Sequence, residues 1–263
     1  MHKVALVTGG SSGIGLHTAL ALHKAGCRVY SLSRRRAGSE EICHIACDVT
    51  SESAVNAAVE QILREAGRID ILVNNAGFGI SGAVELTDSA DAKRQFEVNF
   101  FGMVNVCKAV LPHMRQAGRG RIVNLSSVAA ALPIPFQTYY SASKAAINAY
   151  SQALSNEVKP FGISVCAVMP GDIRTGFTAA RQKQADPNAV YGGRLERSLQ
   201  KMEEDERNGM EPSKAGACIA KLALKKRVKP LYALRLDYKC FVLLSRILPV
   251  RLVNAILYRM YAK

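Results

Sequence analysis

The sequence predicts an α/β protein built on one doubly wound parallel sheet with helices on both faces. The chain has 263 residues, which is long enough for one large domain with a substantial core. Short β-branched runs alternate with segments of helical periodicity, which is the pattern of βαβ units with right-handed crossovers. The first of these runs leads directly into a glycine-rich turn, and a helical segment follows it.

The elements follow in order along the chain. Strands are expected where short apolar runs are bounded by turn residues, at residues 4–7, 28–32, 43–46, 71–73, 122–125 and 163–168. Helices are expected where apolar residues recur at helical spacing, at residues 15–25, 51–66, 89–116 and 141–158. After Pro212 the sequence predicts one more helix at residues 213–224 and a short apolar run at residues 230–234.

Two segments depart from this alternation. Residues 172–210 are polar and contain no apolar run of strand type. We expect them to form a substrate-loop insertion, as a lid or a small helical excursion, within a catalytic domain of residues 1–238. Residues 239–263 are expected to form a basic amphipathic extension of that domain.

The C-terminal extension combines positive charge with an apolar helical face. Residues 221–263 hold eleven Lys and Arg but only one acidic residue, Asp237, in a chain of net charge +14. From Pro249 onward the helical pattern gathers large apolar residues on one face: Leu252, Val253, Ile256, Leu257 and Met260. Two interpretations stay open. The helix packs on the protein's own core or on a sister subunit, or it inserts into an anionic membrane surface.

The composition indicates a folded cytoplasmic protein. It is 49% hydrophobic and 21% charged, which excludes a disordered, collagen-like or coiled-coil chain. The seven cysteines lack the spacing of a disulfide framework, and we expect neither a leader peptide nor a membrane-spanning helix. The basic residues 225–229 lack an accompanying nucleic-acid-binding module, and Cys43, His44 and Cys47 lack a second ligand pair. We therefore expect no nucleic-acid partner and no bound metal.

The glycine-rich turn is a candidate phosphate-binding loop. It lies between an expected strand and an expected helix and reads Thr8, Gly9, Gly10, Ser11, Ser12, Gly13, Ile14 and Gly15. Glycines let the backbone approach a pyrophosphate, and the helix N-terminus stabilises its negative charge. The alternative is that these glycines form only a tight turn between strand and helix.

The end of the second expected strand favours NADP(H) over NAD(H). A site for NAD(H) usually has an Asp or Glu at this position, where it binds the ribose 2′-hydroxyl. Here Ser33 is followed by Arg34, Arg35 and Arg36, and no carboxylate occurs before Glu40. Because a guanidinium binds a 2′-phosphate with paired hydrogen bonds, we expect Ser33, Arg34 and Arg35 to contact NADP(H). The alternative is a solvated basic loop.

Tyr140 and Lys144 form a candidate acid–base pair, with Ser127 upstream. Residues four apart share a helix face, so the Lys144 ammonium can lie beside the Tyr140 phenol. A unit charge at roughly 4 Å and an effective dielectric near 20 is worth about 4 kcal/mol, enough to lower the phenol pKa of about 10 by up to about three pH units. We therefore expect Lys144 to lower the Tyr140 pKa and to make Tyr140 a general acid or base. Taken alone, such a pair is common on helix surfaces.

Together these motifs resemble the short-chain dehydrogenase/reductase family over residues 4–238, and the resemblance implies a Rossmann fold. It implies the catalytic residues Asn99, Ser127, Tyr140 and Lys144. It also implies the following cofactor-binding residues: Thr8, Gly9, Ser11, Ser12, Gly13, Ile14, Gly15, Asp48, Val49, Asn75, Ala76, Gly77, Tyr140, Lys144, Pro170, Gly171, Ile173 and Thr175. Asp172 departs from the pattern, because an apolar or neutral residue is expected beside the nicotinamide.

The resemblance also implies an activity. NADPH would give a hydride to a carbonyl carbon while Tyr140 protonates its oxygen, and an alcohol would react in reverse. Ser127 would hydrogen-bond that oxygen, Lys144 would also hold the nicotinamide ribose, and Asn99 would anchor a water that resupplies the proton.

The implied substrate is an apolar ketone or secondary alcohol of the steroid, retinoid, fatty-acyl or other lipid-like kind. The implied assembly is a homodimer or homotetramer joined through the helix that carries Tyr140 and the helix that follows it. Two alternatives stay open on the same fold: a catalytically silent NADP(H)-sensing protein, and a membrane-peripheral interaction protein that acts through its C-terminal extension.

Overall fold

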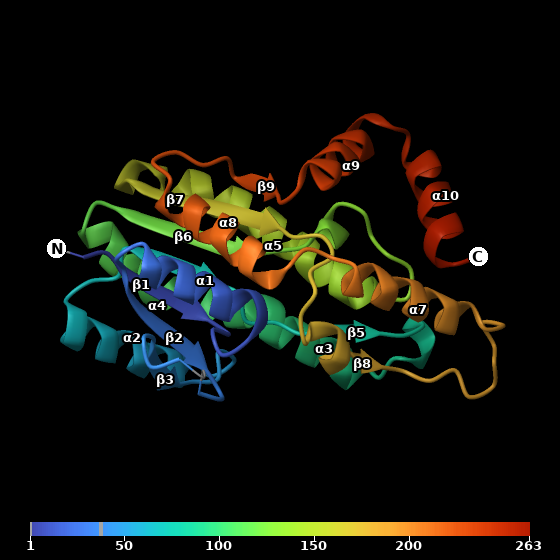
Figure 1. Ribbon diagram of the computed structural model, residues 1–263, viewed down its shortest axis with the longest axis horizontal. Coiled ribbons are helices and arrows are strands. Elements are labelled where there is room, and N and C mark those ends of the chain that lie inside the picture. Colours follow the sequence, from blue (N-terminus) through green and yellow to red (C-terminus); the bar gives the residue numbers. More distant parts are fainter. Residues whose placement is uncertain (1, 37–38) are drawn as a thin grey trace.

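The computed structural model describes residues 2–36 and 39–263 and has the predicted doubly wound architecture (Figure 1). Its main sheet has seven strands in the order β3-β2-β1-β4-β6-β7-β9, and every neighbouring pair is parallel. The strands are β1 (Val4–Thr8), β2 (Arg28–Ser33), β3 (Cys43–Ala46), β4 (Ile71–Asn74), β6 (Gly120–Leu125), β7 (Ile163–Met169) and β9 (Leu231–Ala233). The predicted Rossmann-type sheet is confirmed.

Helices cover both faces of this sheet. On one face lie α1 (Gly13–Lys24) and α8 (Pro212–Leu224), whose apolar residues form a core with the strands. On the other face lie α2 (Glu52–Ala66), α4 (Gly102–Gln116) and α5 (Thr138–Glu157), which bury a second core. Two cores separated by a parallel sheet explain why the central strands β1 and β4 are buried at every position instead of at alternate ones.

The helical stretch expected at residues 89–116 is interrupted by a π-helical turn. It consists of α3 (Ser89–Phe96), the π turn η2 (Glu97–Phe101) and α4. Asn99 is buried inside this turn. The sequence analysis predicted one regular helix here, because the extra residue of a π turn leaves the apolar pattern almost unchanged.

Residues 172–210 contain helices and one short strand. They include α6 (Phe177–Ala180), β8 (Gln182–Lys183) and α7 (Arg194–Arg207). Strand β8 pairs in parallel with β5 (Ile80–Ser81), and Ile173 forms a bridge with Met210. The short 3₁₀ turns are η1 (Val84–Leu86), η3 (Val128–Ala130) and η4 (Lys159–Phe161). The bridge thus joins the two ends of residues 172–210 to each other, and β8 ties the segment to β5.

The C-terminal region forms two helices at one end of the molecule, α9 (Leu236–Ile247) and α10 (Val250–Tyr261) (Figure 1). The boundary expected at residue 238 lies inside α9. The apolar stripe predicted for α10 is divided: Leu257 is buried and Val253 is half-buried, whereas Leu252, Ile256 and Met260 are exposed. Helix α10 therefore packs against α7 with one row of residues and leaves the next row outside. Within the described ranges, no helix has the length and apolarity needed to cross a bilayer.

Candidate active site

A cleft of about 530 Å³ opens at the carboxyl ends of the strands, next to the switch in strand order between β1 and β4. This is where ligands bind in doubly wound sheets, and the volume is typical of small-molecule sites. Most of the predicted site residues line it: Gly9, Ser11, Ser12, Gly13, Ile14, Ser33, Arg34, Arg35, Asp48, Val49, Asn75, Ala76, Gly77, Ser127, Tyr140, Lys144, Pro170, Gly171, Ile173 and Thr175. Thr8, Gly15 and Asn99 lie beneath the lining and support it.

The glycine loop has a backbone that other residues would strain or block. Gly9 and Gly13 have φ angles of +64° and +53°, in the left-handed region that glycine tolerates best. A side chain at Gly15 would overlap the Gly9 carbonyl oxygen and the Asn75 amide. The loop therefore stays close against the start of α1, with backbone N–H groups available for a pyrophosphate.

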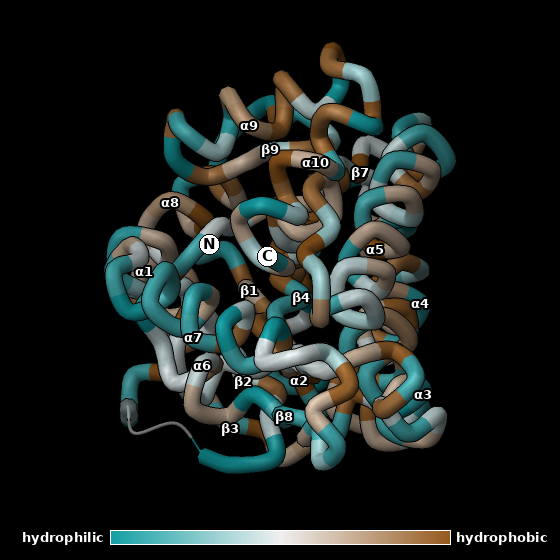
Figure 2. The backbone as a smooth tube through the Cα atoms, turned by 90° about the vertical axis from the view of Figure 1, so that its right-hand side faces the viewer, coloured by the Kyte–Doolittle hydropathy of each residue, from teal (hydrophilic) through white to brown (hydrophobic). Residues whose placement is uncertain are grey.

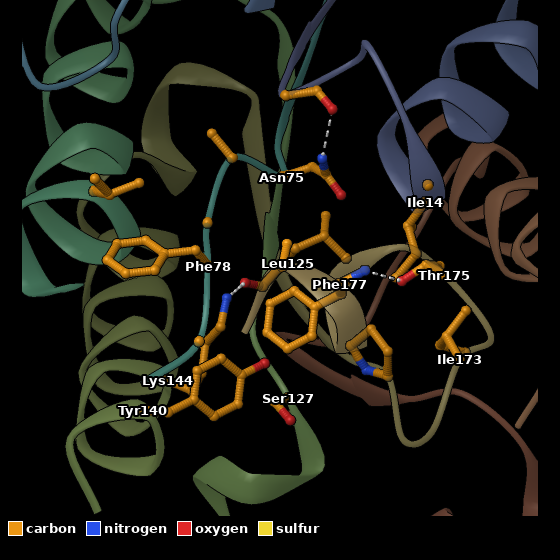
Figure 3. Close-up of a pocket in the computed structure, with 18 of the residues that line it drawn as sticks. Ile14, Asn75, Phe78, Leu125, Ser127, Tyr140, Lys144, Ile173, Thr175 and Phe177 are labelled. Carbon is orange, nitrogen blue, oxygen red and sulfur yellow. Dashed lines mark hydrogen bonds between the residues drawn. The ribbon is translucent and has the colours of Figure 1, made fainter. Parts of the chain in front are cut away.

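Thr8 and Asn75 fasten this loop to the end of β4. The Thr8 hydroxyl accepts hydrogen bonds from the backbone N–H groups of Asn75 and Ala76, each at 3.0 Å. The Asn75 side-chain amide donates to the carbonyl oxygens of Thr8 and Gly9, each at 3.1 Å. These bonds fasten the loop to the end of β4; Figure 3 shows Asn75 with one of them.

The end of β2 presents cationic side chains to the same cleft. Arg34 and Arg35 are exposed and line it, and the Ser33 hydroxyl donates to the Arg35 carbonyl oxygen at 2.7 Å. Hydrogen bonds from Thr50 lower the pKa of Asp48, which also lines the cleft, with a smaller contribution from the charge of Arg34. Asp48 is therefore a carboxylate at neutral pH.

The Asn99 side chain forms hydrogen bonds with the backbone that follows β4. Its side-chain oxygen accepts from the Phe78 N–H at 2.9 Å, and its amide donates to the Phe78 carbonyl at 3.0 Å and to the Ser143 hydroxyl at 3.2 Å. A Cβ atom at Gly77 would lie 3.0 Å from the Asn99 oxygen and 3.7 Å from the Lys144 ammonium nitrogen. Asn99 thus positions the backbone beside Lys144, and its role in anchoring a water stays a prediction.

Tyr140, Lys144 and Ser127 meet in the wall of the cleft (Figure 3). The Lys144 ammonium nitrogen lies 5.6 Å from the centre of the Tyr140 ring and donates to the Leu125 carbonyl oxygen at 2.8 Å. Ser127 caps η3 through its hydroxyl oxygen, which accepts from the Ala129 N–H at 3.1 Å. The turn after β6 therefore brings Ser127 to the first turns of α5, where Tyr140 and Lys144 share one face.

The expected electrostatic effect of Lys144 on Tyr140 is corrected by the structure. Burial raises the pKa of Tyr140 to about 12, an effect that exceeds the lowering caused by its hydrogen bond with Ser127. Burial also lowers the pKa of Lys144 to about 8. The attraction of the ammonium for a phenolate favours a lower Tyr140 pKa, but the loss of water around both groups, which the sequence does not reveal, outweighs it. The Tyr140 phenol is therefore protonated at neutral pH, as a proton donor must be.

The other half of the cleft is lined by residues that the sequence analysis did not single out. Phe177 of α6 packs on Tyr140 with ring centres 5.8 Å apart. Helix α7 contributes Met202 and Glu206, and α10 contributes Tyr261. No local motif marks these residues, because separate elements bring them to the cleft only in the folded chain.

Comparisons with known proteins identify the family. Residues 3–186 match the family described as short chain dehydrogenase. A 3-ketodihydrosphingosine reductase of Bacteroides thetaiotaomicron is 47% identical over 227 residues, which cover 85% of this chain and 84% of the relative. The chain therefore belongs to the short-chain dehydrogenase family and is an oxidoreductase of that family.

Solved structures agree with this assignment. A short-chain dehydrogenase from Streptomyces avermitilis is 33% identical, with a TM-score of 0.82 over 98% of this chain and 96% of that one. A 3-ketoacyl-(acyl-carrier-protein) reductase from Brucella melitensis, solved in complex with NADH, is 27% identical, with a TM-score of 0.75 over 88% of this chain and 96% of that one. The family relationship thus establishes the class of nicotinamide cofactor but leaves open the choice between its two forms.

Proposed function

We propose that this protein reduces the ketone of a lipid-like substrate with NADPH. The observation that carries the proposal is the Tyr140 phenol beside Ser127 and Lys144, in a cleft that also contains the glycine loop. NADPH would supply the hydride. Tyr140 donates its proton to the carbonyl oxygen, which becomes far more basic than a phenolate as the hydride arrives, and Ser127 hydrogen-bonds the same oxygen.

Arg34 and Arg35 support NADP(H) as the cofactor. Both line the cleft next to Ser33, where the 2′-position of the adenosine ribose would lie. No carboxylate occupies the end of β2, and a phosphate is bound strongly by charge-assisted hydrogen bonds from guanidinium groups. The glycine loop and the volume of the cleft suit a dinucleotide of either form, so the arginines carry the preference.

The substrate is proposed to be a long-chain keto compound. Apolar side chains of Ala129, Ile134, Phe177 and Met202 line the half of the cleft beyond Tyr140, which we call the substrate half. The 47% identical relative is named for the reduction of 3-ketodihydrosphingosine, a long-chain amino ketone. We take this compound as the test substrate for the present chain.

The test is an assay of the purified protein with NADPH or NADH and a panel of ketones. The panel contains 3-ketodihydrosphingosine, a long-chain ketone without nitrogen, a 3-ketoacyl thioester and a steroid ketone. We expect NADPH consumption with the long-chain ketones and at least a tenfold higher kcat/KM for NADPH than for NADH. Cofactor binding without turnover of any ketone would instead favour a cofactor-sensing protein.

The surface of α9 and α10 supports a second proposal, that the protein binds anionic membranes. Ten of the fourteen large apolar side chains exposed in the described residues belong to these two helices: Leu236, Phe241, Leu243, Leu244, Ile247, Val250, Leu252, Ile256, Tyr258 and Met260. Figure 2 shows these helices together at one end of the molecule. Arg246, Arg251 and Arg259 are exposed among them. Apolar and cationic groups on one surface fit an anionic bilayer.

This surface also adjoins the substrate half of the cleft. Tyr261, at the end of α10, lines the cleft, and its hydroxyl donates to Asp205 of α7 at 3.3 Å. A lipid-like ketone would thus reach the cleft from the bilayer without crossing bulk water. We propose a cytoplasmic location at the membrane periphery, where this surface contacts the bilayer. Homodimer or homotetramer formation through α5 stays a prediction.

Co-sedimentation with vesicles tests the membrane proposal. The wild-type protein should sediment with vesicles of phosphatidylcholine and phosphatidylglycerol in equal amounts, less so at high salt, and should stay in solution with phosphatidylcholine alone. The double variant Ile247→Asp and Ile256→Asp should lose at least tenfold in affinity, because two exposed apolar contacts become anionic. The matched control, Val84→Asp with Val190→Asp, changes exposed apolar residues elsewhere. Equal loss in both double variants would contradict a role for this surface.

A further inference from the structure

We propose that Asp172 binds a cationic nitrogen next to the reacting carbonyl of the substrate, so that the enzyme selects amino ketones over neutral ketones. The inference rests on the proposed ketone reduction and adds a chemical class to its substrate. It starts from Asp172 as a carboxylate in the wall of the cleft, at a position where the sequence led us to expect a neutral residue.

The backbone of Asp172 is fixed on both sides. Its carbonyl oxygen accepts from the Met210 N–H at 2.9 Å, and its own N–H donates to the Tyr238 hydroxyl at 3.2 Å. The Tyr238 ring packs directly on the backbone at Gly171, where a Cβ atom would overlap it. Asp172 therefore does not depend on a mobile loop for its position.

The side chain of Asp172 is also held. The Tyr238 hydroxyl donates a hydrogen bond to one carboxylate oxygen, Oδ2. The second oxygen has no hydrogen-bond donor in the part of the chain that the structure describes. Tyr238 thus orients the carboxylate and leaves one of its oxygens for another donor.

Asp172 differs from the other carboxylate of the substrate half in lacking a cationic partner. Glu206 forms an ion pair with Arg181, whose side chain is 1% exposed, and also accepts from the Thr178 hydroxyl at 2.5 Å. Among the residues that the structure describes, Asp172 forms no ion pair. Arg235 and Lys201 act on it only through their more distant charges. The substrate half therefore carries one uncompensated acidic group.

A partly buried carboxylate without a cationic partner favours a cation at the same place. Burial raises the pKa of Asp172, the Tyr238 hydrogen bond opposes this effect, and the like charge of Asp205 adds to it, so the surroundings disfavour a lone negative charge at Asp172. A substrate ammonium would offset that penalty and would donate a charge-assisted hydrogen bond to the free oxygen.

The position of Asp172 relative to Tyr140 defines where this cation belongs. The charge of Asp172 is close enough to contribute to the raised pKa of Tyr140, and both residues line the same cleft. A ketone whose oxygen receives the Tyr140 proton would present its neighbouring carbon atoms to Asp172. The matching substrate class is an aliphatic ketone with an amino group on a carbon next to the carbonyl, as in the proposed test substrate.

Two substrates and two variants test this inference. The substrates are 3-ketodihydrosphingosine and a ketone of the same chain length and hydroxylation that has no amino group. We expect the wild-type enzyme to prefer the amino ketone by about 100-fold in kcat/KM, and Asp172→Asn to reduce that ratio to within a few-fold of one. The matched control is Glu203→Gln, which removes a carboxylate of α7 that lies outside the cleft lining and pairs with Lys183, and it should leave the ratio unchanged.

A measurement on the wild type serves if Asp172→Asn fails to fold, as judged by its thermal transition. A long-chain amine should inhibit the wild-type enzyme at least tenfold more strongly than the corresponding neutral alcohol. Equal reduction of both ketones by the wild type, equal loss of both in Asp172→Asn, or equal inhibition by amine and alcohol would overturn the assignment of Asp172 while ketone reduction itself stands. Failure of the wild type to reduce either ketone would instead refute the proposed function and, with it, this inference.

Discussion

Replacing Tyr140 with Phe is expected to lower kcat for ketone reduction by about 1000-fold, which corresponds to about 4 kcal/mol of transition-state stabilisation. The change removes one hydroxyl group and keeps the ring that packs against Phe177. The change removes the proton donor. Lys144 does not replace it, because its ammonium group is engaged with the Leu125 carbonyl oxygen. Single-turnover oxidation of NADPH with 3-ketodihydrosphingosine measures the chemical step directly.

NADPH binding serves as the control for Tyr140→Phe. We expect the dissociation constant for NADPH to change less than threefold, because the glycine loop and the arginines stay in place. The matched variant Tyr139→Phe removes the neighbouring hydroxyl, which does not line the cleft, and should keep near wild-type kcat. Retention of more than a tenth of the wild-type kcat in Tyr140→Phe would exclude Tyr140 as the proton donor.

The double variant Arg34→Ala with Arg35→Ala is expected to raise the KM for NADPH by about 100-fold. Each charge-assisted hydrogen bond to a phosphate contributes roughly 1.5 to 3 kcal/mol of binding free energy. Because both arginine side chains are exposed, we expect the double variant to lose an amount near the lower end of the range for two such bonds. The KM for NADH should change less than threefold, because NADH carries no 2′-phosphate. Steady-state kinetics with both cofactors at a saturating ketone concentration measures the difference.

Arg36→Ala is the matched control for this experiment. Arg36 is exposed and adjacent in sequence but does not line the cleft. Its removal tests whether positive charge in this region affects NADPH binding without direct contact. We expect the KM for NADPH to change less than threefold. A double variant that weakens both cofactors equally would indicate that the arginines support only the loop and that the preference for NADP(H) is wrong.

The cofactor half of the site was largely predictable because its signals are local. A strand, a glycine loop and a helix occur within the first 24 residues, and the positive φ angles at Gly9 and Gly13 require the residue type that the sequence supplies. The missing carboxylate after β2 is equally visible in the sequence. Gly15 was placed in the cofactor site, and the structure shows that it acts by allowing close contact with Gly9 and Asn75.

The substrate half was not predictable, because its residues come from separate elements. Phe177, Met202 and Tyr261 belong to α6, α7 and α10, and each would be read from the sequence as an ordinary apolar or amphipathic residue. The charge of Asp172 was noted, but its partner Tyr238 lies 66 positions later. The π turn at Asn99 was missed because apolar periodicity does not record one extra residue within a helix.

The pKa of Tyr140 could not be derived from spacing alone. The spacing of four residues correctly places Lys144 near the Tyr140 ring. The direction in which the Tyr140 pKa changes depends on burial, which only the folded chain defines. The result changes the emphasis of the mechanism. A phenol with a pKa of about 12 suits proton donation to a product alkoxide better than proton removal from an alcohol.

Hydride transfer to a long-chain ketone is the most direct test of this account. Wild-type protein is mixed with 3-ketodihydrosphingosine and NADPH that carries deuterium on the transferred position of the nicotinamide, and the product is analysed by mass spectrometry. We expect one deuterium on the carbinol carbon of the alcohol, with about 1000-fold slower formation in Tyr140→Phe. Absence of labelled alcohol with the wild type, in the presence of demonstrated NADPH binding, would contradict it.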